Sequence, residues 1–254
     1  MPGRPLRRLP GRLSLRRLIA IGALLGAAAL AQAAPPFRDD MAQRTLACTA
    51  CHGEQGRAGP DGYYPRLAGK PAGYLYNQLL NFRDGRRHYG LMTHMVSLMS
   101  DAYLAELARY FAAMQVPYPP PAVAPVAPAP EALLRGEKLA RQGDEVVKLP
   151  ACIQCHGDRL MGTQPNVPAL LGLPADYLMA QLGGWKTGQR KALTPDCMTS
   201  VVRRLSDADA LAVVTWLAAQ PVPVDTAPAA VPPASAPPPP ELRCGSAPLP
   251  GATP

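Results

Sequence analysis

The sequence contains few aromatic side chains and few histidines. Phe, Trp and Tyr make up 6% of its 254 residues, with only three Phe and two Trp, so aromatic rings supply little of a hydrophobic core. The four histidines are His52, His88, His94 and His156, and the last is the only one in the second half of the chain. A metal site that needs two imidazoles is therefore excluded from that half.

The N-terminus lacks acidic residues, and no later segment is apolar and long enough to cross a membrane. Residues 1–33 hold six Arg, an apolar run over residues 18–30 and the small-x-small sequence Ala31-Gln32-Ala33. This pattern predicts a cleaved signal peptide over residues 1–33 and export to the periplasm. An uncleaved anchor is the alternative, although the 17 residues from 18 to 34 are rich in Ala and Gly and would span a membrane poorly.

The net charge of +8 comes mostly from that same segment. Without its six Arg, 20 basic residues face 18 acidic residues in the rest of the chain. A chain so nearly balanced does not have the excess positive charge that binds nucleic acid. We therefore expect no nucleic-acid partner.

Proline is concentrated in two stretches that divide the chain. Such composition predicts an extended linker over residues 117–130 and a tail over residues 221–254. Two segments of similar size remain, 36–116 and 131–220, which we call the first copy and the second copy because they repeat each other. Matched residues are 103 to 106 positions apart; they are Cys48, Cys51, His52, Pro65, Tyr74, Gln78, Phe82, Met92 and Ser100 with Cys152, Cys155, His156, Pro168, Tyr177, Gln181, Trp185, Met198 and Ser206.

Each copy is predicted to be helical. Leu75, Leu79 and Phe82 fall on one helix face, as do their matches in the second copy. Ser100 and Ser206, each followed by Asp, are good N-caps for a last helix. The alternating pattern typical of strands is missing. The fold class is therefore all-α, with two tandem domains of a few short helices each.

The sequence Cys-x-x-Cys-His occurs once in each copy, as Cys48-Thr-Ala-Cys51-His52 and Cys152-Ile-Gln-Cys155-His156. It is the signature of c-type haem attachment, in which two thiols bond the haem and the His ligates its iron. A structural zinc site needs four ligands close together, whereas these pairs are about 100 residues apart. A thioredoxin-like redox pair needs an α/β context that is absent. We expect two covalently attached haem c groups.

The sixth iron ligand is predicted to be a methionine in each copy. Met92 lies 40 residues after His52 and Met198 lies 42 residues after His156, and each precedes a helix-starting Ser by eight residues. This paired placement favours them over Met95 and Met99 in the first copy and over Met161 and Met179 in the second. His88 and His94 are possible rivals in the first copy.

These residues resemble those of the dihaem cytochrome c4 type, which is built from two class I cytochrome c domains. The resemblance implies that Pro65 and Pro168 accept a hydrogen bond from the proximal His through their carbonyls. It implies that Tyr110 and Trp216 pack the last helix on the first. It also implies periplasmic electron transfer from a quinol-oxidising complex toward a terminal oxidase. The long, proline-rich linker departs from the family's short joint and weighs against tight haem–haem packing.

Two cysteines remain outside the motifs, Cys197 and Cys244. An even pair in an oxidising compartment suggests a disulfide that folds the tail back onto the second copy beside Met198. A free thiol, an intermolecular bond or a Cys197 thiolate on the iron are the alternatives.

The leading interpretation is an electron carrier rather than an enzyme. His/Met ligation fills both axial positions, and an iron without an open site is poorly suited to substrate chemistry. The expected partners are redox proteins: a quinol-oxidising cytochrome complex, a terminal oxidase or a dehydrogenase, with peripheral association with membrane complexes. The alternatives are the cytochrome subunit of a periplasmic dehydrogenase or a dihaem redox enzyme with one labile ligand.

Overall fold

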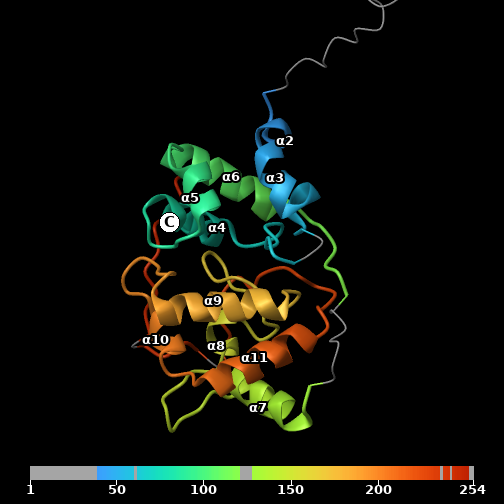
Figure 1. Ribbon diagram of the computed structural model, residues 1–254, viewed down its shortest axis with the longest axis vertical. Coiled ribbons are helices and arrows are strands. Elements are labelled where there is room, and N and C mark those ends of the chain that lie inside the picture. Colours follow the sequence, from blue (N-terminus) through green and yellow to red (C-terminus); the bar gives the residue numbers. More distant parts are fainter. Residues whose placement is uncertain (1–38, 60–61, 121–127, 235–236, 241, 252–254) are drawn as a thin grey trace, which may run out of the picture. The chain divides into compact units, whose positions relative to one another are not determined.

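Helices are the only regular secondary structure in the part of the chain that the computed structural model describes (Figure 1). That part comprises residues 39–59, 62–120, 128–234, 237–240 and 242–251. Isolated β-bridges occur in it, but no strand. The predicted signal peptide and residues 121–127 of the predicted linker lie outside the described residues. The all-α prediction is confirmed.

The helices occur in matching sets along the two copies. The first copy contains α2 (Met41–Arg44), α3 (Leu46–His52), the 3-10 turn η1 (Glu54–Gly56), α4 (Ala72–Arg83), α5 (Gly90–Val96) and α6 (Asp101–Ala113). The second copy contains α7 (Pro130–Arg141), α8 (Ile153–His156), α9 (Ala175–Thr187), α10 (Cys197–Val202) and α11 (Asp207–Ala219). Asp40–Pro254 form one compact unit.

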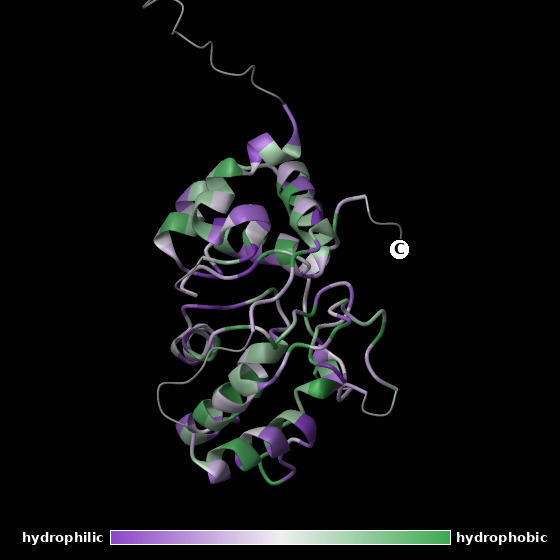
Figure 2. Ribbon diagram, turned by 90° about the vertical axis from the view of Figure 1, so that its right-hand side faces the viewer, coloured by the Kyte–Doolittle hydropathy of each residue, from purple (hydrophilic) through white to green (hydrophobic). Residues whose placement is uncertain are grey.

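Each copy has its own hydrophobic cluster. In the first, buried residues of α4 and α6 pack together with Val96 of α5. In the second, α7, α9 and α11 pack around Leu160 and Met161, which follow the second Cys-x-x-Cys-His motif. Figure 2 shows hydrophobic residues in both groups of helices, interspersed with hydrophilic ones. None of the helices in the described residues is long and apolar enough to span a membrane.

The last helix of each copy begins where the sequence predicts. The hydroxyl of Ser100 accepts a hydrogen bond from the backbone N–H of Tyr103 at 3.3 Å, and Ser206 accepts one from Asp209 at 3.0 Å. Each bond satisfies one of the free N–H groups of a first helical turn. The acidic residue after each serine adds a favourable charge at the helix N-terminus.

Helices α7 and α11 cross closely at Gly136. A Cβ built on Gly136 would collide with the backbone carbonyl of Ala212 and lie 2.6 Å from the Cβ of Trp216. Trp216 is buried at this crossing, which agrees with the expected packing of the last helix on the first. The absence of a side chain at position 136 thus allows the two helices to approach.

Gly136→Ala is expected to destabilise the protein by about 2 kcal/mol, because overpacking at a helix crossing outweighs the better helix propensity of Ala. Urea unfolding followed by circular dichroism measures this change. The matched control is Gly183→Ala in α9, where nothing lies within 4 Å of the new Cβ, so stability there should stay equal or rise. Equal stabilities of the two variants would contradict the close crossing.

The two copies contact each other directly through a backbone bridge. Arg87 and Arg190 form an antiparallel bridge, with His88 N–H donating to the Gln189 carbonyl at 2.8 Å and Lys191 N–H to the Arg86 carbonyl at 2.7 Å. Arg87 and Arg190 occupy matched positions in the repeat. The linker therefore joins copies that meet through equivalent residues.

The tail is tied to the second copy by a disulfide between Cys197 and Cys244. This confirms the predicted pairing over the alternatives of a free or intermolecular thiol. The four motif cysteines, Cys48, Cys51, Cys152 and Cys155, are free of disulfides.

Candidate haem-binding sites

Both motif histidines are buried and held in the same way. His52 Nδ1 lies 2.8 Å from the carbonyl oxygen of Pro65, and His156 Nδ1 lies 2.7 Å from that of Pro168. Because a carbonyl only accepts, each Nδ1 carries the proton and each Nε2 keeps a free lone pair. Burial lowers the pKa of both histidines, which favours the neutral, ligating form.

The motif cysteines lie at the helical segments that end at these histidines. Cys48 and Cys51 belong to α3. In the second copy, Cys152 is the N-cap residue of α8 and Cys155 lies within that helix. Burial raises the pKa of Cys48 and Cys155, and it raises the pKa of Cys152 to about 12. The raised pKa favours the protonated thiol at these three positions, which slows exchange with thiols in solution.

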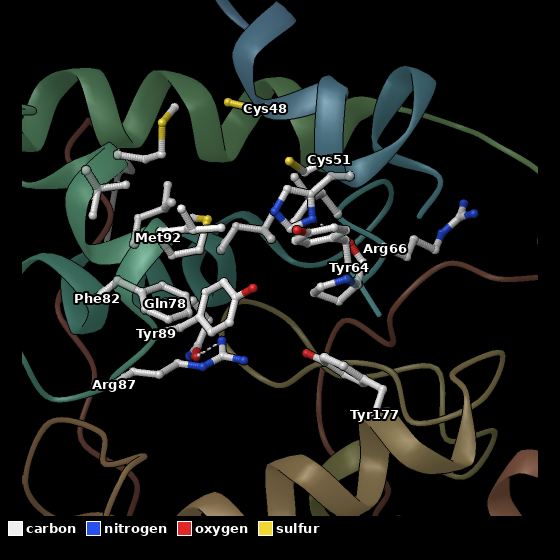
Figure 3. Close-up of a pocket in the computed structure, with 18 of the residues that line it drawn as sticks. Cys48, Cys51, Tyr64, Arg66, Gln78, Phe82, Arg87, Tyr89, Met92 and Tyr177 are labelled. Atoms are coloured by element: carbon white, nitrogen blue, oxygen red, sulfur yellow. Dashed lines mark hydrogen bonds between the residues drawn. The ribbon is translucent and has the colours of Figure 1, made fainter. Parts of the chain in front are cut away.

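A cavity of about 710 Å³, lined mainly by the first copy and in part by α9 and Arg190 of the second, brings the predicted site residues of the first copy together. Cys48, Cys51 and His52 line it from α3, and Met92 lines it from α5. Figure 3 shows the two cysteines on one side of the cavity, Met92 at another, and Arg87 and Tyr177 opposite the cysteines. The lining is mostly apolar, as expected of a site for a large flat ring.

Three rival ligands of the first copy, His88, His94 and Met95, are exposed. His88 lines the cavity but is exposed, and His94 is exposed without lining it. Met95 and Met99 also line the cavity, and Met95 is exposed. Met92 and Met99 are both partly buried against the hydrophobic cluster of this copy, and the matched position of Met198 in the repeat favours Met92.

In the second copy, the three candidate methionines differ in burial and in the helix or loop on which they lie. Met198 is the second residue of α10, which matches α5, and it is half-buried. Met161 is a buried member of the hydrophobic cluster, and Met179 packs against that cluster from α9. Met161 therefore has a packing role, and Met198 occupies the place in α10 that matches Met92 in α5.

Two buried polar atoms have no hydrogen-bond partner among the described residues: Thr93 Oγ1 and Trp185 Nε1. A buried donor without a partner costs about 1–3 kcal/mol, so such atoms normally find one. Thr93 follows Met92, and Trp185 lies on the face of α9 that was predicted to be apolar. Neither residue lines the cavity of the first copy, so the fit to haem rests instead on the paired thiols, the free Nε2 of each motif His and the apolar cavity lining.

Sequence reasoning missed a buried cationic cluster between the copies. Arg87 donates to the side-chain oxygens of Gln78 at 2.9 Å and Gln181 at 2.6 Å. Arg190, only 6% exposed, donates to Gln181 at 2.7 Å and to Gln78 and the Tyr74 hydroxyl at 3.2 Å. Each guanidinium also stacks on a matched aromatic ring, Phe82 for Arg87 and Trp185 for Arg190.

The cluster has an excess of positive charge. Among the described residues, neither arginine forms an ion pair with a carboxylate, and the buried Lys70 lines the same cavity. Burial and the charge of Arg87 lower the pKa of Arg190, and burial lowers that of Lys70. Burial opposes ionisation of Tyr74, but the neighbouring cations outweigh it and lower its pKa to about 8. Buried cations normally pair with anions, so the side of the cavity that these cations line is suited to a ligand with negative groups.

The chain is similar to known dihaem cytochromes, although no family model matches it. The chain is 40% identical over 82% of its length to a thiosulfate dehydrogenase electron acceptor of Thiomonas intermedia, covering 93% of that protein. It is 32% identical over 79% of its length to a cytochrome c4 of Pseudomonas aeruginosa, covering 96% of it.

Two solved structures are also similar. A thiosulfate dehydrogenase of Marichromatium purpuratum superposes with a TM-score of 0.59 at 32% identity over 69% of this chain, which corresponds to 36% of that longer protein. Reduced cytochrome c4 of Pseudomonas stutzeri superposes with a TM-score of 0.57 at 30% identity, over 69% of this chain and 94% of that one.

Proposed function

The chain belongs to the cytochrome c4 family of dihaem c-type cytochromes, and on this premise we propose that it is the electron acceptor of a periplasmic dehydrogenase that oxidises thiosulfate. As a member of that family it carries two covalently attached haem c groups and transfers electrons. Periplasmic location is part of the proposal and is supported by the signal-like features of residues 1–33.

The motif residues are the proposed holders of the two haems. Cys48 and Cys51 would bond one haem and Cys152 and Cys155 the other, with His52 and His156 as proximal ligands and Met92 and Met198 as distal ligands. Pro65 and Pro168 hold the two imidazoles by their Nδ1–H groups and so direct Nε2 to the iron. The bound iron supplies reversible one-electron chemistry, and the domains 36–116 and 131–220 are proposed to be the units that surround each haem.

Arg190, which is buried, and Arg87, which is half-buried, are proposed to balance the propionates. Vinyl groups and propionates occupy opposite edges of haem, and Arg87 lies opposite Cys48 and Cys51 across the cavity (Figure 3). Arg190 lines the same cavity from the second copy. Positive charge near an iron disfavours its oxidised form, so these arginines raise the reduction potential.

Arg190→Gln is expected to lower a haem reduction potential by about 40 mV, which corresponds to roughly 1 kcal/mol of lost interaction with a partly buried charge. Spectroelectrochemical titration measures the shift. Arg190→Lys keeps the charge and should lower the potential less. Arg203, which is exposed, provides a matched control: Arg203→Gln should change little because solvent screens its charge. An unchanged potential in Arg190→Gln would contradict this assignment.

The main support for a thiosulfate dehydrogenase as the electron donor is the 40% identity to a relative that is named as the electron acceptor of such an enzyme, 93% of which is covered. A second relative of the same name, from Stutzerimonas stutzeri, is 35% identical over 68% of this chain. The Marichromatium thiosulfate dehydrogenase adds that a chain similar to this one forms part of such a protein.

The rate of haem reduction, followed by stopped-flow absorption, tests whether a thiosulfate dehydrogenase is the electron donor. The ferric protein is mixed with a purified thiosulfate dehydrogenase and thiosulfate, and two electrons per chain are expected to appear as reduced haem. Omitting the dehydrogenase should abolish the fast phase. Reduction no faster than with thiosulfate alone would reject this donor.

Transfer from a quinol-oxidising complex toward a terminal oxidase is the second candidate. It is supported by the relatives named cytochrome c4, at 32–33% identity. Fast reduction by such a complex with quinol, together with no reduction by the dehydrogenase, would favour it.

A further inference from the structure

The C-terminal tail follows the second haem-attachment segment before it reaches the disulfide. Ala229 N–H donates to the Gly162 carbonyl at 2.9 Å, and its own carbonyl accepts from Gln164 N–H at 2.8 Å. The Pro237 carbonyl accepts from Gln154, which lies inside the Cys-x-x-Cys-His motif, at 2.9 Å. This part of the tail is thus fixed against residues that surround His156.

The tail is then fastened to the N-terminus of α10. Cys244 bonds Cys197, the first residue of α10 and the neighbour of Met198. Gly245 N–H donates to the Pro195 carbonyl at 2.7 Å. A Cβ on Gly245 would lie 2.5 Å from the carbonyl oxygens of Leu193 and Thr194, so the tail backbone lies directly on the segment that leads into α10.

Beyond the disulfide the tail docks on the first copy. The side chain of Asn77 in α4, only 7% exposed, pairs with the backbone of Ala247: its Oδ1 accepts from Ala247 N–H at 2.8 Å and its Nδ2 donates to the Ala247 carbonyl at 3.1 Å. Leu249 packs on the hydrophobic cluster of the first copy, and Arg109 of α6 donates to the Pro250 carbonyl. The tail therefore connects α10 to α4 and α6.

This arrangement distinguishes the two copies. The residue of the first copy that matches Cys197 is Leu91, the neighbour of Met92 in α5, and it is 60% exposed. Among the described residues, α5 carries no covalent tether. Helices α5 and α10 are both short, with seven and six residues, and a short helix alone fixes its side chains weakly.

We propose that residues 244–250 form a strap that positions α10, and through it Met198, by anchoring the start of this helix to the first copy. The strap makes the distal ligand of the second haem harder to displace than that of the first. The proposal rests on the proposed function, in which Met198 is that ligand. Cys197, Cys244 and Asn77 are positioning residues that act through α10.

Cyanide binding to the ferric protein tests the strap, because cyanide enters only when the distal ligand leaves. In the wild-type protein, two phases are expected, and the slower one belongs to the second haem. In Cys197→Ser/Cys244→Ser that phase should accelerate at least about tenfold, since local opening becomes easier without the tether. The first haem serves as the internal control and should keep its rate.

Asn77→Ala tests the strap from its other end with the disulfide intact. A substitution in the first copy should then accelerate cyanide binding to the second haem by about threefold to tenfold, because the two hydrogen bonds that Asn77 makes to the tail are lost. Ser246→Ala is the matched control in the tail, because its hydroxyl only accepts an exposed hydrogen bond from Asn166, and it should leave both phases unchanged.

Met198→Leu separates this proposal from the one on which it rests. If Met198→Leu leaves the second haem six-coordinate, the ligand assignment fails and the strap has no ligand to position. If Met198→Leu opens that haem while the disulfide and Asn77 variants bind cyanide at the wild-type rate, the strap alone is rejected. Equal acceleration at both haems would also reject it, because general destabilisation acts on both copies.

Discussion

Met198→Leu is expected to let one of the two ferrous haems bind carbon monoxide, whereas the wild-type protein binds none. Leu has nearly the volume of Met but no sulfur, so the substitution removes the ligand with little disturbance of packing. The open position then accepts an external ligand. The loss of the thioether should also lower the potential of that haem, on the order of 100 mV, because Met ligation favours reduced iron.

The spectrum of the reduced protein before and after addition of carbon monoxide measures the effect. Met92→Leu should open the other haem, and the double variant should open both. Met161→Leu is the matched control, because Met161 is buried in the hydrophobic cluster of the second copy and should leave the spectrum unchanged. Carbon monoxide binding to the wild-type protein would instead indicate a labile ligand and favour a redox enzyme.

Removal of the Cys197–Cys244 bond is expected to lower the free energy of unfolding by about 4 kcal/mol. The bond closes a loop with a sequence separation of 47, and the chain-entropy model gives about this value for such a loop. For a protein of this size, the loss corresponds to a decrease of about 10 °C in melting temperature. Calorimetry of Cys197→Ser/Cys244→Ser measures it.

The control for this prediction is a count of thiols in the denatured, unreduced protein. The holoprotein should show none, because four cysteines are bonded to haem and two to each other, and Cys244→Ser alone should show one. A melting temperature equal to that of the wild-type protein would mean that the tail retains its place without the bond.

Features that depend on local chemistry or on the repeat were predictable from the sequence. The starts of α6 and α11 follow from Ser100 and Ser206, because an N-cap acts on the N–H groups of its own first turn. The disulfide followed from counting cysteines after the motifs were assigned. The placement of Met92 on the cavity wall followed from comparing the copies.

Contacts between distant segments were not predictable in the same way. The pairing of Asn77 with Ala247 uses backbone atoms of the tail, and any residue offers those atoms. The cationic cluster did leave a signal, since Arg87 and Arg190 recur at matched positions with Gln78 and Gln181. That signal is weak without a structure, because a repeated arginine is compatible with two exposed side chains as well as with two buried ones.

The bridge between Arg87 and Arg190 has the form of a contact in a twofold-symmetric homodimer, in which the same surface of each subunit meets its equivalent. Here the two subunits have become one polypeptide. Covalent linkage holds each partner at an effective concentration in the millimolar range, so the contact needs far less intrinsic affinity than a dimer of separate chains. A polar, charge-rich interface of the kind formed by these arginines and glutamines is therefore sufficient. Its two sides are also free to diverge in sequence, since each substitution changes only one side.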